Sequence, residues 1–222
     1  QCMVCGRVSM STDGFCEGSS DGGEYTARRL LLRGGQRLGV SYRSAVFEDT
    51  APRLHDFDKD GSPEVVTVVS TFEAGARVQI FALKTGTLIP IVSNLPIGTR
   101  NRWLAIAGIA DFNDDGLDDI AYVDRPHLAK VLRLMSVDLD GMTGSTQDLI
   151  SKDGLTNHHY SSPLIEGGVR DCGGVPPVLV TADADWQNIV ETQMADGKLH
   201  SSVVAPYDGA DSFQPFLTCP AG

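Results

Sequence analysis

The chain has 222 residues, of which 41% are hydrophobic and 24 are glycine, so it can form a folded core with many turns and few long helices. Its formal net charge of −11 argues against a nucleic-acid partner, which would require a basic surface, and suits cation binding instead. No apolar run approaches the roughly 18 residues of a membrane-spanning helix, so we expect no direct membrane span.

The N-terminal segment, residues 1–24, is set apart by its cysteines. It holds Cys2, Cys5 and Cys16, whereas Cys172 and Cys219 lie near the other end of the chain. Five cysteines allow two disulfides and one free thiol, and their pairing is left open. A zinc site is disfavoured because no second C-x-x-C and no paired histidines follow. We therefore expect disulfides, and with them an oxidising compartment.

An internal repeat begins downstream of this segment. Asp56 opens "DFDKDGSPEVV" and Asp111 opens "DFNDDGLDDIA", 55 residues later; a further 60 residues lead to Asp171, in "DCGGVPPVLV". Each copy reads as an aspartate, a glycine-containing turn and an apolar, β-like run. A period of this length indicates a repeat architecture.

Each copy continues into a predicted β-hairpin. The turns carry Gly86, Gly141 and Gly197, because glycine supplies the backbone angles that tight turns require. A partial fourth copy, "ARRLLLRGGQRLGVS" at residues 27–41, has the same order of strand, turn and strand.

Together these patterns predict an all-β protein. Four antiparallel strands in each repeat of about 55 residues are typical of a β-propeller, with about four four-stranded blades and five as the alternative. A β-sandwich with accidental internal similarity is the competing interpretation. We place the propeller at residues 25–205 and expect the C-terminal tail, residues 206–222, to be able to supply a strand that closes the ring.

The acidic turns have the oxygen-rich spacing of a cation site. Positions 1, 3, 5 and 9 carry side-chain oxygens, position 6 is glycine and position 7 offers a carbonyl oxygen. The predicted ligands are Asp56, Asp58, Asp60, Ser62 (carbonyl) and Glu64 in the first copy, and Asp111, Asn113, Asp115, Leu117 (carbonyl) and Asp119 in the second. Hard oxygen ligands in a flexible loop favour Ca²⁺ over Zn²⁺ and Mg²⁺, so two calcium ions are expected; a solvated acidic turn is the alternative.

The motif differs from an EF-hand in two respects. Position 12 is Thr67 or Tyr122 rather than a bidentate glutamate, and a β-branched strand follows in place of a helix. The pattern D-x-[DN]-x-D-G-x-x-[DE] followed by a strand instead resembles the FG-GAP/VCBS repeat of integrin α-subunit propellers and of many bacterial surface or secreted proteins. The resemblance covers roughly residues 25–205.

The resemblance implies that each ion cross-links the turn between the first two strands of a blade. The third copy keeps Asp171 but lacks the remaining oxygens, so no ion is expected there. The related-looking "ADADW" at residues 182–186 falls in a later loop of its repeat.

Unusual residues gather in the loops expected at the opposite ends of the strands. These are the predicted blade links 47–53, 98–103 and 155–161, and the predicted strand 2–3 loops 72–76, 124–129 and 183–187. The candidate partner-binding residues are Arg100, Arg102, Trp103, Asp124, Arg125, His127, His158, Asp183, Asp185 and Trp186. Arginine and tryptophan beside histidine are typical of recognition surfaces. The alternative is that they tie and fill neighbouring blades.

Three functions remain open at this stage. The first is a calcium-stabilised, extracellular, cell-surface or periplasmic module for adhesion or assembly, with a protein or glycan partner on the face opposite the calcium loops. The second is a carbohydrate-active hydrolase or lyase that uses an Arg/His/Asp cluster, although no nucleophile-elbow, zinc-protease or phosphate-loop motif is present. The third is a structural subunit of a larger surface assembly or filament.

Overall fold

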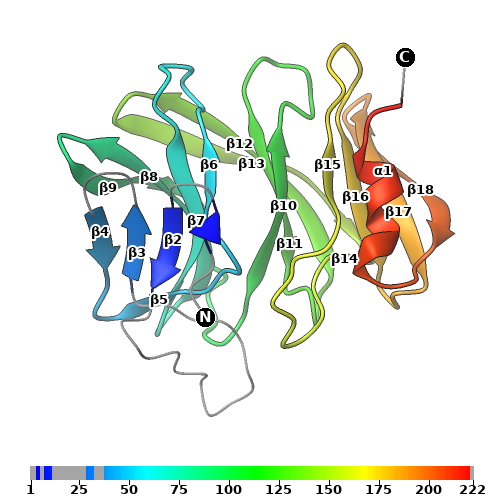
Figure 1. Ribbon diagram of the computed structural model, residues 1–222, viewed down its shortest axis with the longest axis horizontal. Helices are drawn as coiled ribbons and strands as arrows, with labels where there is room; N and C mark the ends of the chain where they lie inside the picture. The colour runs from blue at the N-terminus through cyan, green and yellow to red at the C-terminus, as the bar shows by residue number, and fades with distance from the viewer. Residues whose placement is uncertain (1–3, 6–7, 12–28, 33–37, 221–222) are drawn as a thin grey trace. The chain divides into compact units, whose positions relative to one another are not determined.

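The computed structural model describes residues 4–5, 8–11, 29–32 and 38–220 (Figure 1). The predicted turn at Gly34 and Gly35, and the cysteines Cys2 and Cys16, lie outside the described residues. The side chain of Cys5 is likewise not described, so the pairing of these three cysteines stays open.

The described part of the chain is built almost entirely of antiparallel β-sheet, which confirms the all-β prediction. Four sheets follow one another in sequence order. The first sheet contains β1 (Val4–Cys5), β2 (Val8–Ser11), β3 (Arg29–Leu32) and β4 (Leu38–Ser41), and the second contains β5 (Ala45–Phe47), β6 (Arg53–His55), β7 (Glu64–Thr71), β8 (Gly75–Lys84) and β9 (Thr87–Ser93). The third sheet contains β10 (Leu104–Ala110), β11 (Asp119–Asp124), β12 (Val131–Asp140) and β13 (Thr143–Asp153). The fourth sheet contains β14 (Leu155–Thr156), β15 (Gly168–Arg170), β16 (Val178–Asp183), β17 (Asn188–Ala195) and β18 (Lys198–Pro206).

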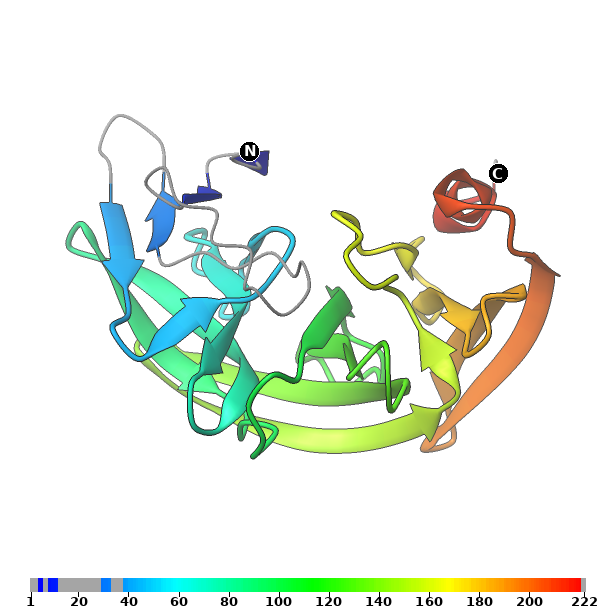
Figure 2. The same ribbon diagram turned by 90° about the horizontal axis from the view of Figure 1, so that it is seen from below.

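The chain divides into two compact units. Unit 1 comprises Gln1–Leu104, Asp138–Thr146 and Tyr160–Pro163, and unit 2 comprises Ala105–Val137, Gln147–His159 and Leu164–Gly222. Apart from the first strands of the second and fourth sheets, the strands pair with their sequence neighbours, as β7 pairs with β8 and β8 with β9, and Figure 2 shows the sheets from a second side. This sequential pairing is the meander expected from the repeat.

Two first strands are interrupted, which corrects the predicted blade links at 47–53 and 155–161. Both β5 and β6 pair with β7, and both β14 and β15 pair with β16. Most of residues 47–53 and 155–161 therefore lies in excursions within a first strand rather than between sheets. The reason is that a polar excursion, such as "EDTAP", carries the same turn-forming residues as a true link. The third predicted link, 98–103, does lie between β9 and β10.

The second strands of the second, third and fourth sheets, β7, β11 and β16, are buried along nearly their whole length. Every residue of β11 is buried, and in β7 only Thr71 is not. Since successive side chains of a strand point to opposite faces, these strands are covered on both faces. Their β-branched sequence, "EVVTVVST" in β7, suits that environment.

The apolar cores follow from this pattern. In unit 1, Phe47 and Phe81 belong to a cluster that also contains Val65 and Leu88. In unit 2 a larger cluster joins the apolar side chains of β10, β11, β12, β16 and β17. Fully burying one such side chain stabilises the fold by about 1.5–3 kcal/mol. Gly108 permits this packing, because a Cβ atom there would meet the Val169 side chain at 2.2 Å.

The predicted hairpin turns are present. Gly86, Gly141 and Gly197 connect β8 to β9, β12 to β13 and β17 to β18, and all three have positive φ. The residues before two of them, Thr85 and Asp196, also have positive φ, as a two-residue hairpin turn of mirror-image type requires.

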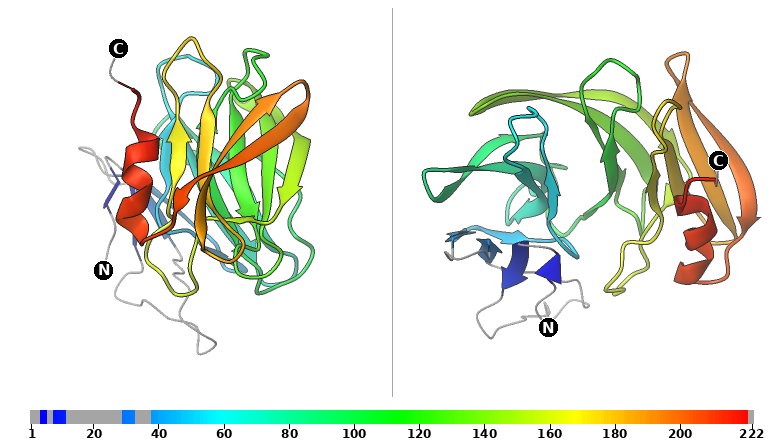
Figure 3. Two further views of the ribbon diagram at one scale, coloured as in Figure 1. Left: turned by 90° about the vertical axis from the view of Figure 1, so that its right-hand side faces the viewer. Right: turned by 45° about the horizontal axis from the view of Figure 1, so that its top comes forward.

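The C-terminal tail forms a 3-10 turn, η1 (Ala210–Phe213), and a short helix, α1 (Gln214–Leu217). Helix α1 lies beside β15 (Figure 3), and Phe213 is buried in a cluster with residues of β16 and β17. The expectation that this tail supplies a ring-closing strand is wrong for its described residues, because the chain turns into η1 and α1 after β18 and adds no strand beyond Pro206. Among the described residues, no helix has the length and apolar character needed to cross a membrane.

Candidate functional site

The first acidic loop, residues 56–64, connects β6 to β7 and is organised by its own carboxylates. Asp56 accepts two backbone hydrogen bonds, from Asp60 N to Oδ1 at 3.1 Å and from Gly61 N to Oδ2 at 2.9 Å. Asp58 Oδ1 also accepts from Asp60 N at 3.2 Å. Asp60 Oδ1 accepts from Ser62 N at 2.7 Å, so three carboxylates fold the turn around one centre.

The same loop closes with Glu64, the first residue of β7. Glu64 is buried, and its Oε2 accepts from Phe57 N at 3.1 Å. One oxygen each of Asp56, Asp58 and Glu64 lies within 4.8 Å of the others, as the ligands of a single cation would. The second oxygen of Asp58 accepts from Gly141 N at 3.2 Å, in the turn between β12 and β13.

The second acidic loop, residues 111–119, connects β10 to β11 and repeats most of these hydrogen bonds. Asp111 accepts from Asp115 N at 3.2 Å and from Gly116 N at 2.8 Å, and Asp115 Oδ1 accepts from Leu117 N at 2.9 Å. Asp119 Oδ2 accepts from Phe112 N at 3.1 Å, as Glu64 does from Phe57.

The two loops differ at position 3, which is Asp58 in the first loop and Asn113 in the second, both in hydrogen bonding and in charge. Asn113 Oδ1 accepts from Asp115 N at 3.2 Å, as Asp58 does from Asp60, but its Nδ2 donates to Asp115 Oδ2 at 2.8 Å. The amide thus brings one fewer negative charge to its loop. The geometry is otherwise the same in two separate stretches of chain, so the motif itself specifies the conformation.

The backbone of both loops is strained at the same positions. Lys59 and Asp114, at position 4, have φ of 57° and 60°, and the glycines at position 6, Gly61 and Gly116, have φ of 87° and 90°. Left-handed residues of this kind are costly for lysine, and they persist where the surroundings fix them. Here the carboxylate–amide bonds do so.

Position 9 of each loop is a buried carboxylate, and the described residues satisfy the one in the second loop only in part. Asp119 is fully buried, and its Oδ1 has no hydrogen-bond partner among the described residues. Burial raises the pKa of Asp119 to about 6, and burial, opposed by the Phe57 amide, raises that of Glu64. An oxygen left unpaired beside further carboxylates fits a bound cation, because it offers an acceptor that no donor in the described part of the chain uses.

The third loop, residues 171–177, lies between β15 and β16. Asp171 Oδ1 accepts from Gly173 N at 3.0 Å, and the first residue of β16 is a buried valine, Val178, in place of a carboxylate. Cys172 of this loop forms a disulfide with Cys219, beyond α1. This pair resolves part of the cysteine pairing that the sequence leaves open.

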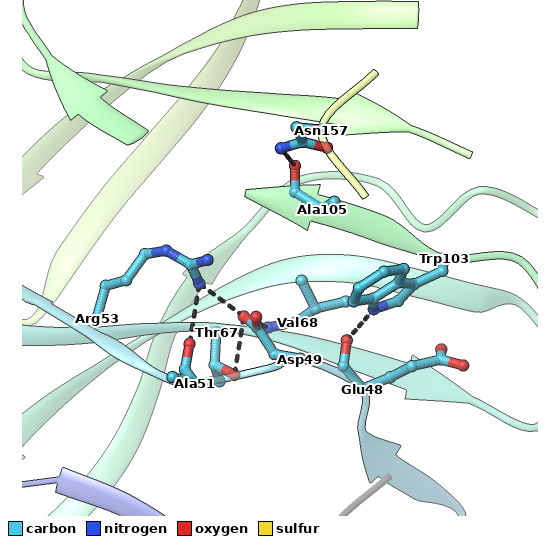
Figure 4. A network of polar contacts seen from close by, with 9 residues as sticks. All are labelled: Glu48, Asp49, Ala51, Arg53, Thr67, Val68, Trp103, Ala105 and Asn157. Carbon is cyan, nitrogen blue, oxygen red and sulfur yellow. Dashed lines mark hydrogen bonds and ion pairs between the residues drawn. The ribbon is translucent and has the colours of Figure 1, made fainter. Parts of the chain in front are cut away.

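In unit 1 the predicted partner-binding residues do not form one cluster. Trp103 is buried, and its Nε1 donates to the Glu48 carbonyl (Figure 4). Arg100 and Arg102 are exposed or half-buried, and Arg102 Nη1 donates to the Asn101 carbonyl at 2.7 Å. Trp103 thus belongs to the buried core rather than to the exposed surface.

A buried carboxylate that sequence reasoning missed lies beside this tryptophan. Asp49 Oδ2 accepts from Arg53 Nη1 at 2.9 Å and from Val68 N at 3.3 Å (Figure 4). Burial, opposed by Arg53, raises the pKa of Asp49. The charge pair is local, and its only sequence signal is an aspartate and an arginine four residues apart.

In unit 2 most of the predicted residues are engaged with one another. The buried Asp124 pairs with Arg125 at 2.7 Å and with Arg133 at 3.1 Å. His127 Nε2 lies 2.8 Å from His158 Nδ1, and His158 is almost fully buried. These contacts bring His127 and His158 together, and they fit a structural role for Asp124.

Asp183, Asp185 and Trp186 share one turn, between β16 and β17. Asp183 Oδ1 accepts from Gln187 N at 2.8 Å and Oδ2 from Asn188 Nδ2 at 2.7 Å. Burial acts to raise the pKa of Asp183, but these hydrogen bonds outweigh it and lower the pKa. Asp185 is exposed and Trp186 half-buried.

Residues outside the predicted set complete the surroundings of Trp186. Its ring stacks on that of His159 and lies near that of Tyr207, which hydrogen-bonds Glu166. Neither Glu166 nor Tyr207 carries a motif that would single it out, since the two are 41 residues apart and only the fold joins them.

Comparison with known proteins gives one match. The chain has no significant match among curated proteins or among solved structures. The family model of the FG-GAP-like repeat matches residues 56–122, a segment that runs from the first residue of the first acidic loop to just beyond the end of the second. Residues 56–122 are therefore similar to the FG-GAP-like repeat.

Proposed function

We propose that the chain is a calcium-stabilised β-propeller module that works outside the cytoplasm and binds a partner. The observation that carries this proposal is the duplicated acidic loop. Two separate segments adopt the same hydrogen bonds, the same backbone angles and the same buried closing carboxylate. A mere solvated turn has no need of a buried carboxylate with an unpaired oxygen.

The ions would be held by the oxygen set of each loop. In the first loop these are Asp56, Asp58, Asp60, Glu64 and the Ser62 carbonyl. In the second they are Asp111, Asn113, Asp115, Asp119 and the Leu117 carbonyl. Five oxygen-bearing ligands in each loop, without nitrogen or sulfur, suit Ca²⁺, and second carboxylate oxygens or water would complete its roughly six to eight coordination positions. The ion would neutralise carboxylates that otherwise repel one another at close range.

A propeller arrangement is supported by the repeat itself. The described sheets follow the same sequential strand order, and the acidic loops fall between the first and second strands of two of them. Second strands buried on both faces, such as β11, need a neighbouring layer on each side. Radial stacking of sheets supplies such layers, and each described sheet would then be one blade.

An extracytoplasmic location is supported by the disulfide and by the type of calcium site. Cys172 and Cys219 pair within unit 2, and such bonds persist in oxidising compartments. Loops of this kind, by analogy with extracellular modules, bind calcium with a dissociation constant of about 10⁻⁴–10⁻³ M, which only extracellular calcium would saturate.

Calcium titration by calorimetry tests the proposal. We expect two ions to bind the wild-type chain. Asp60→Ala and Asp115→Ala, at position 5 of each loop, should each leave one ion, and the double variant none. Asp171→Ala, in the third loop, is the matched control and should retain both. An unchanged thermal midpoint in calcium and in EDTA, with no heat of binding, would refute the ion sites.

A further inference from the structure

Three elements of unit 2 bring aromatic rings together at the end of the fourth sheet. Trp186 lies in the turn between β16 and β17, His159 in the excursion between β14 and β15, and Tyr207 directly after β18. The His159 and Trp186 rings stack with centroids 3.6 Å apart and an angle of 18°. Tyr207 lies 5.0 Å from Trp186 and 5.9 Å from His159, inclined to both. We call these three residues the aromatic ledge.

The turn that carries Trp186 is rigid. Trp186 has a left-handed φ of 55°, an unfavourable conformation for so bulky a residue. Asp183 holds the turn through Gln187 N and Asn188 Nδ2, and Lys130 Nζ donates to the Ala184 carbonyl. The indole is therefore fixed before any ligand arrives, which lowers the entropy cost of binding.

The hydrogen bonds below the ledge set the tautomer of His159. Tyr207 Oη donates its single proton to Glu166 Oε2 at 2.8 Å, and Glu166 is buried. His159 Nε2 lies 3.2 Å from the same Tyr207 oxygen, so it must be the donor in that contact. In the neutral imidazole, Nδ1 is then left as an acceptor.

His159 Nε2 also lies 3.9 Å from Glu166 Oε1, and with the His159 ring neutral the free polar groups of the ledge are acceptors. His159 Nδ1 has no hydrogen-bond partner within the described part of the chain, and the His159 side chain is 43% exposed. The exposed carboxylate of Asp185, next to Trp186, likewise accepts no hydrogen bond from the residues described. A matching ligand must bring hydroxyl or N–H donors together with an apolar face.

We infer that the aromatic ledge of His159, Trp186 and Tyr207, with the acceptors His159 Nδ1 and Asp185, binds a neutral sugar ring. A pyranose offers an apolar C–H face for an aromatic ring and hydroxyl donors around its rim. This inference names the ligand of the binding module proposed above, and it rests on that proposal.

Charge distinguishes this ligand from its competitors. A net charge of −11 disfavours sulfated or uronic-acid glycans. A basic peptide could approach the Asp185 carboxylate, but the Lys130 ammonium, which donates to the adjacent Ala184 carbonyl, brings a like charge to the same turn. A protein partner needs a broad set of anchors, whereas the ledge offers three rings and two acceptors.

The inference can be tested with a panel of neutral methyl glycosides, whose binding is followed by saturation-transfer NMR and by tryptophan fluorescence. One sugar ring should bind with a dissociation constant of about 1 mM. The two tryptophans supply the matched pair: Trp186→Ala should abolish binding and the fluorescence change, and Trp103→Phe, in unit 1, should retain both.

Tyr207→Phe keeps the ring but removes the hydroxyl that orients His159. We expect it to weaken glycoside binding about tenfold. Each variant is also titrated with calcium, because two bound ions show that the fold and the proposed calcium sites are intact. Binding of neutral glycosides that Trp186→Ala abolishes supports the inference. Absence of binding with both ions present overturns it without touching the calcium proposal, and so does capture of only basic peptides or only sulfated glycans.

Discussion

The second acidic loop and the third loop occupy the same place in two successive sheets, yet they are closed by different chemistry. Each connects the first strand of its sheet to the second, and each begins with an aspartate whose carboxylate accepts a backbone amide, Asp111 or Asp171. The second strand then opens with a buried residue, which is Asp119 in one case and Val178 in the other.

This single buried position decides what the rest of the loop needs. Asp119 has an oxygen without a donor among the described residues, so its loop would gain from the proposed cation. Val178 joins an apolar cluster with Phe213 and needs no counter-charge, and the Cys172–Cys219 disulfide holds the loop to the C-terminal segment. One turn would thus depend on calcium and the other on oxidation.

The largest effect expected from this comparison comes from removal of the disulfide. Cys172→Ser combined with Cys219→Ser should lower the free energy of unfolding by about 2–4 kcal/mol, because the bond closes a loop with a sequence separation of 47 residues. The loss should be equal in calcium and in EDTA, as measured by denaturant titration. A loss confined to the calcium-loaded protein would show that the two kinds of cross-link are coupled.

The next effect is expected from conversion of the second loop to the chemistry of the third. Asp119→Val should abolish one calcium site and with it about 2.7 kcal/mol of stabilisation at a calcium concentration 100 times the dissociation constant. In EDTA the change should be small. Without calcium, removal of the buried charge stabilises the protein. This gain is offset because Phe112 N loses its hydrogen-bond acceptor, a loss that costs about 1–3 kcal/mol. Equal losses in both conditions would mean that Asp119 is no ion ligand.

The sequence is sufficient to predict the acidic loops and the strands around them, because their signals are local. Aspartates at alternate positions, Gly61 or Gly116 at position 6 and a β-branched run specify the turn within a dozen residues. The hairpin turns at Gly86 and Gly197 follow from the same kind of short-range pattern. The all-β class is therefore readable from the chain.

Other features depend on contacts between distant residues and leave no local signal. The excursions within the first strands resemble ordinary links, because strand pairing with β7 or β16 is visible only in three dimensions. The pairing of Cys172 with Cys219 is one of several that five cysteines allow. The aromatic ledge joins residues from three separate elements, and only Trp186 stands out by residue type.

A smaller effect is expected from exchange at position 3, where the two acidic loops themselves differ. Asn113→Asp should tighten calcium binding at the second loop about tenfold, since it adds a charged ligand, and should slightly destabilise the protein in EDTA through repulsion with Asp115. Asp58→Asn should weaken the first site by a similar factor. Calorimetric titration of each variant measures both, and unchanged affinities would exclude position 3 from the ligand set.

The smallest effect separates backbone strain from ion binding. The third loop places Gly173 at a φ of 64°, whereas the first acidic loop places Lys59 at 57°. A Cβ atom at Gly173 would have no neighbour within 4 Å, so Gly173→Ala should cost about 1 kcal/mol through conformation alone. Lys59→Gly should change stability by less than about 1 kcal/mol, because relief of strain is offset by the greater freedom of the unfolded chain. Both changes should be the same in calcium and in EDTA when unfolding is followed by circular dichroism. A calcium-dependent cost for Gly173→Ala would instead mean that the third loop, despite its disulfide, also responds to the ion.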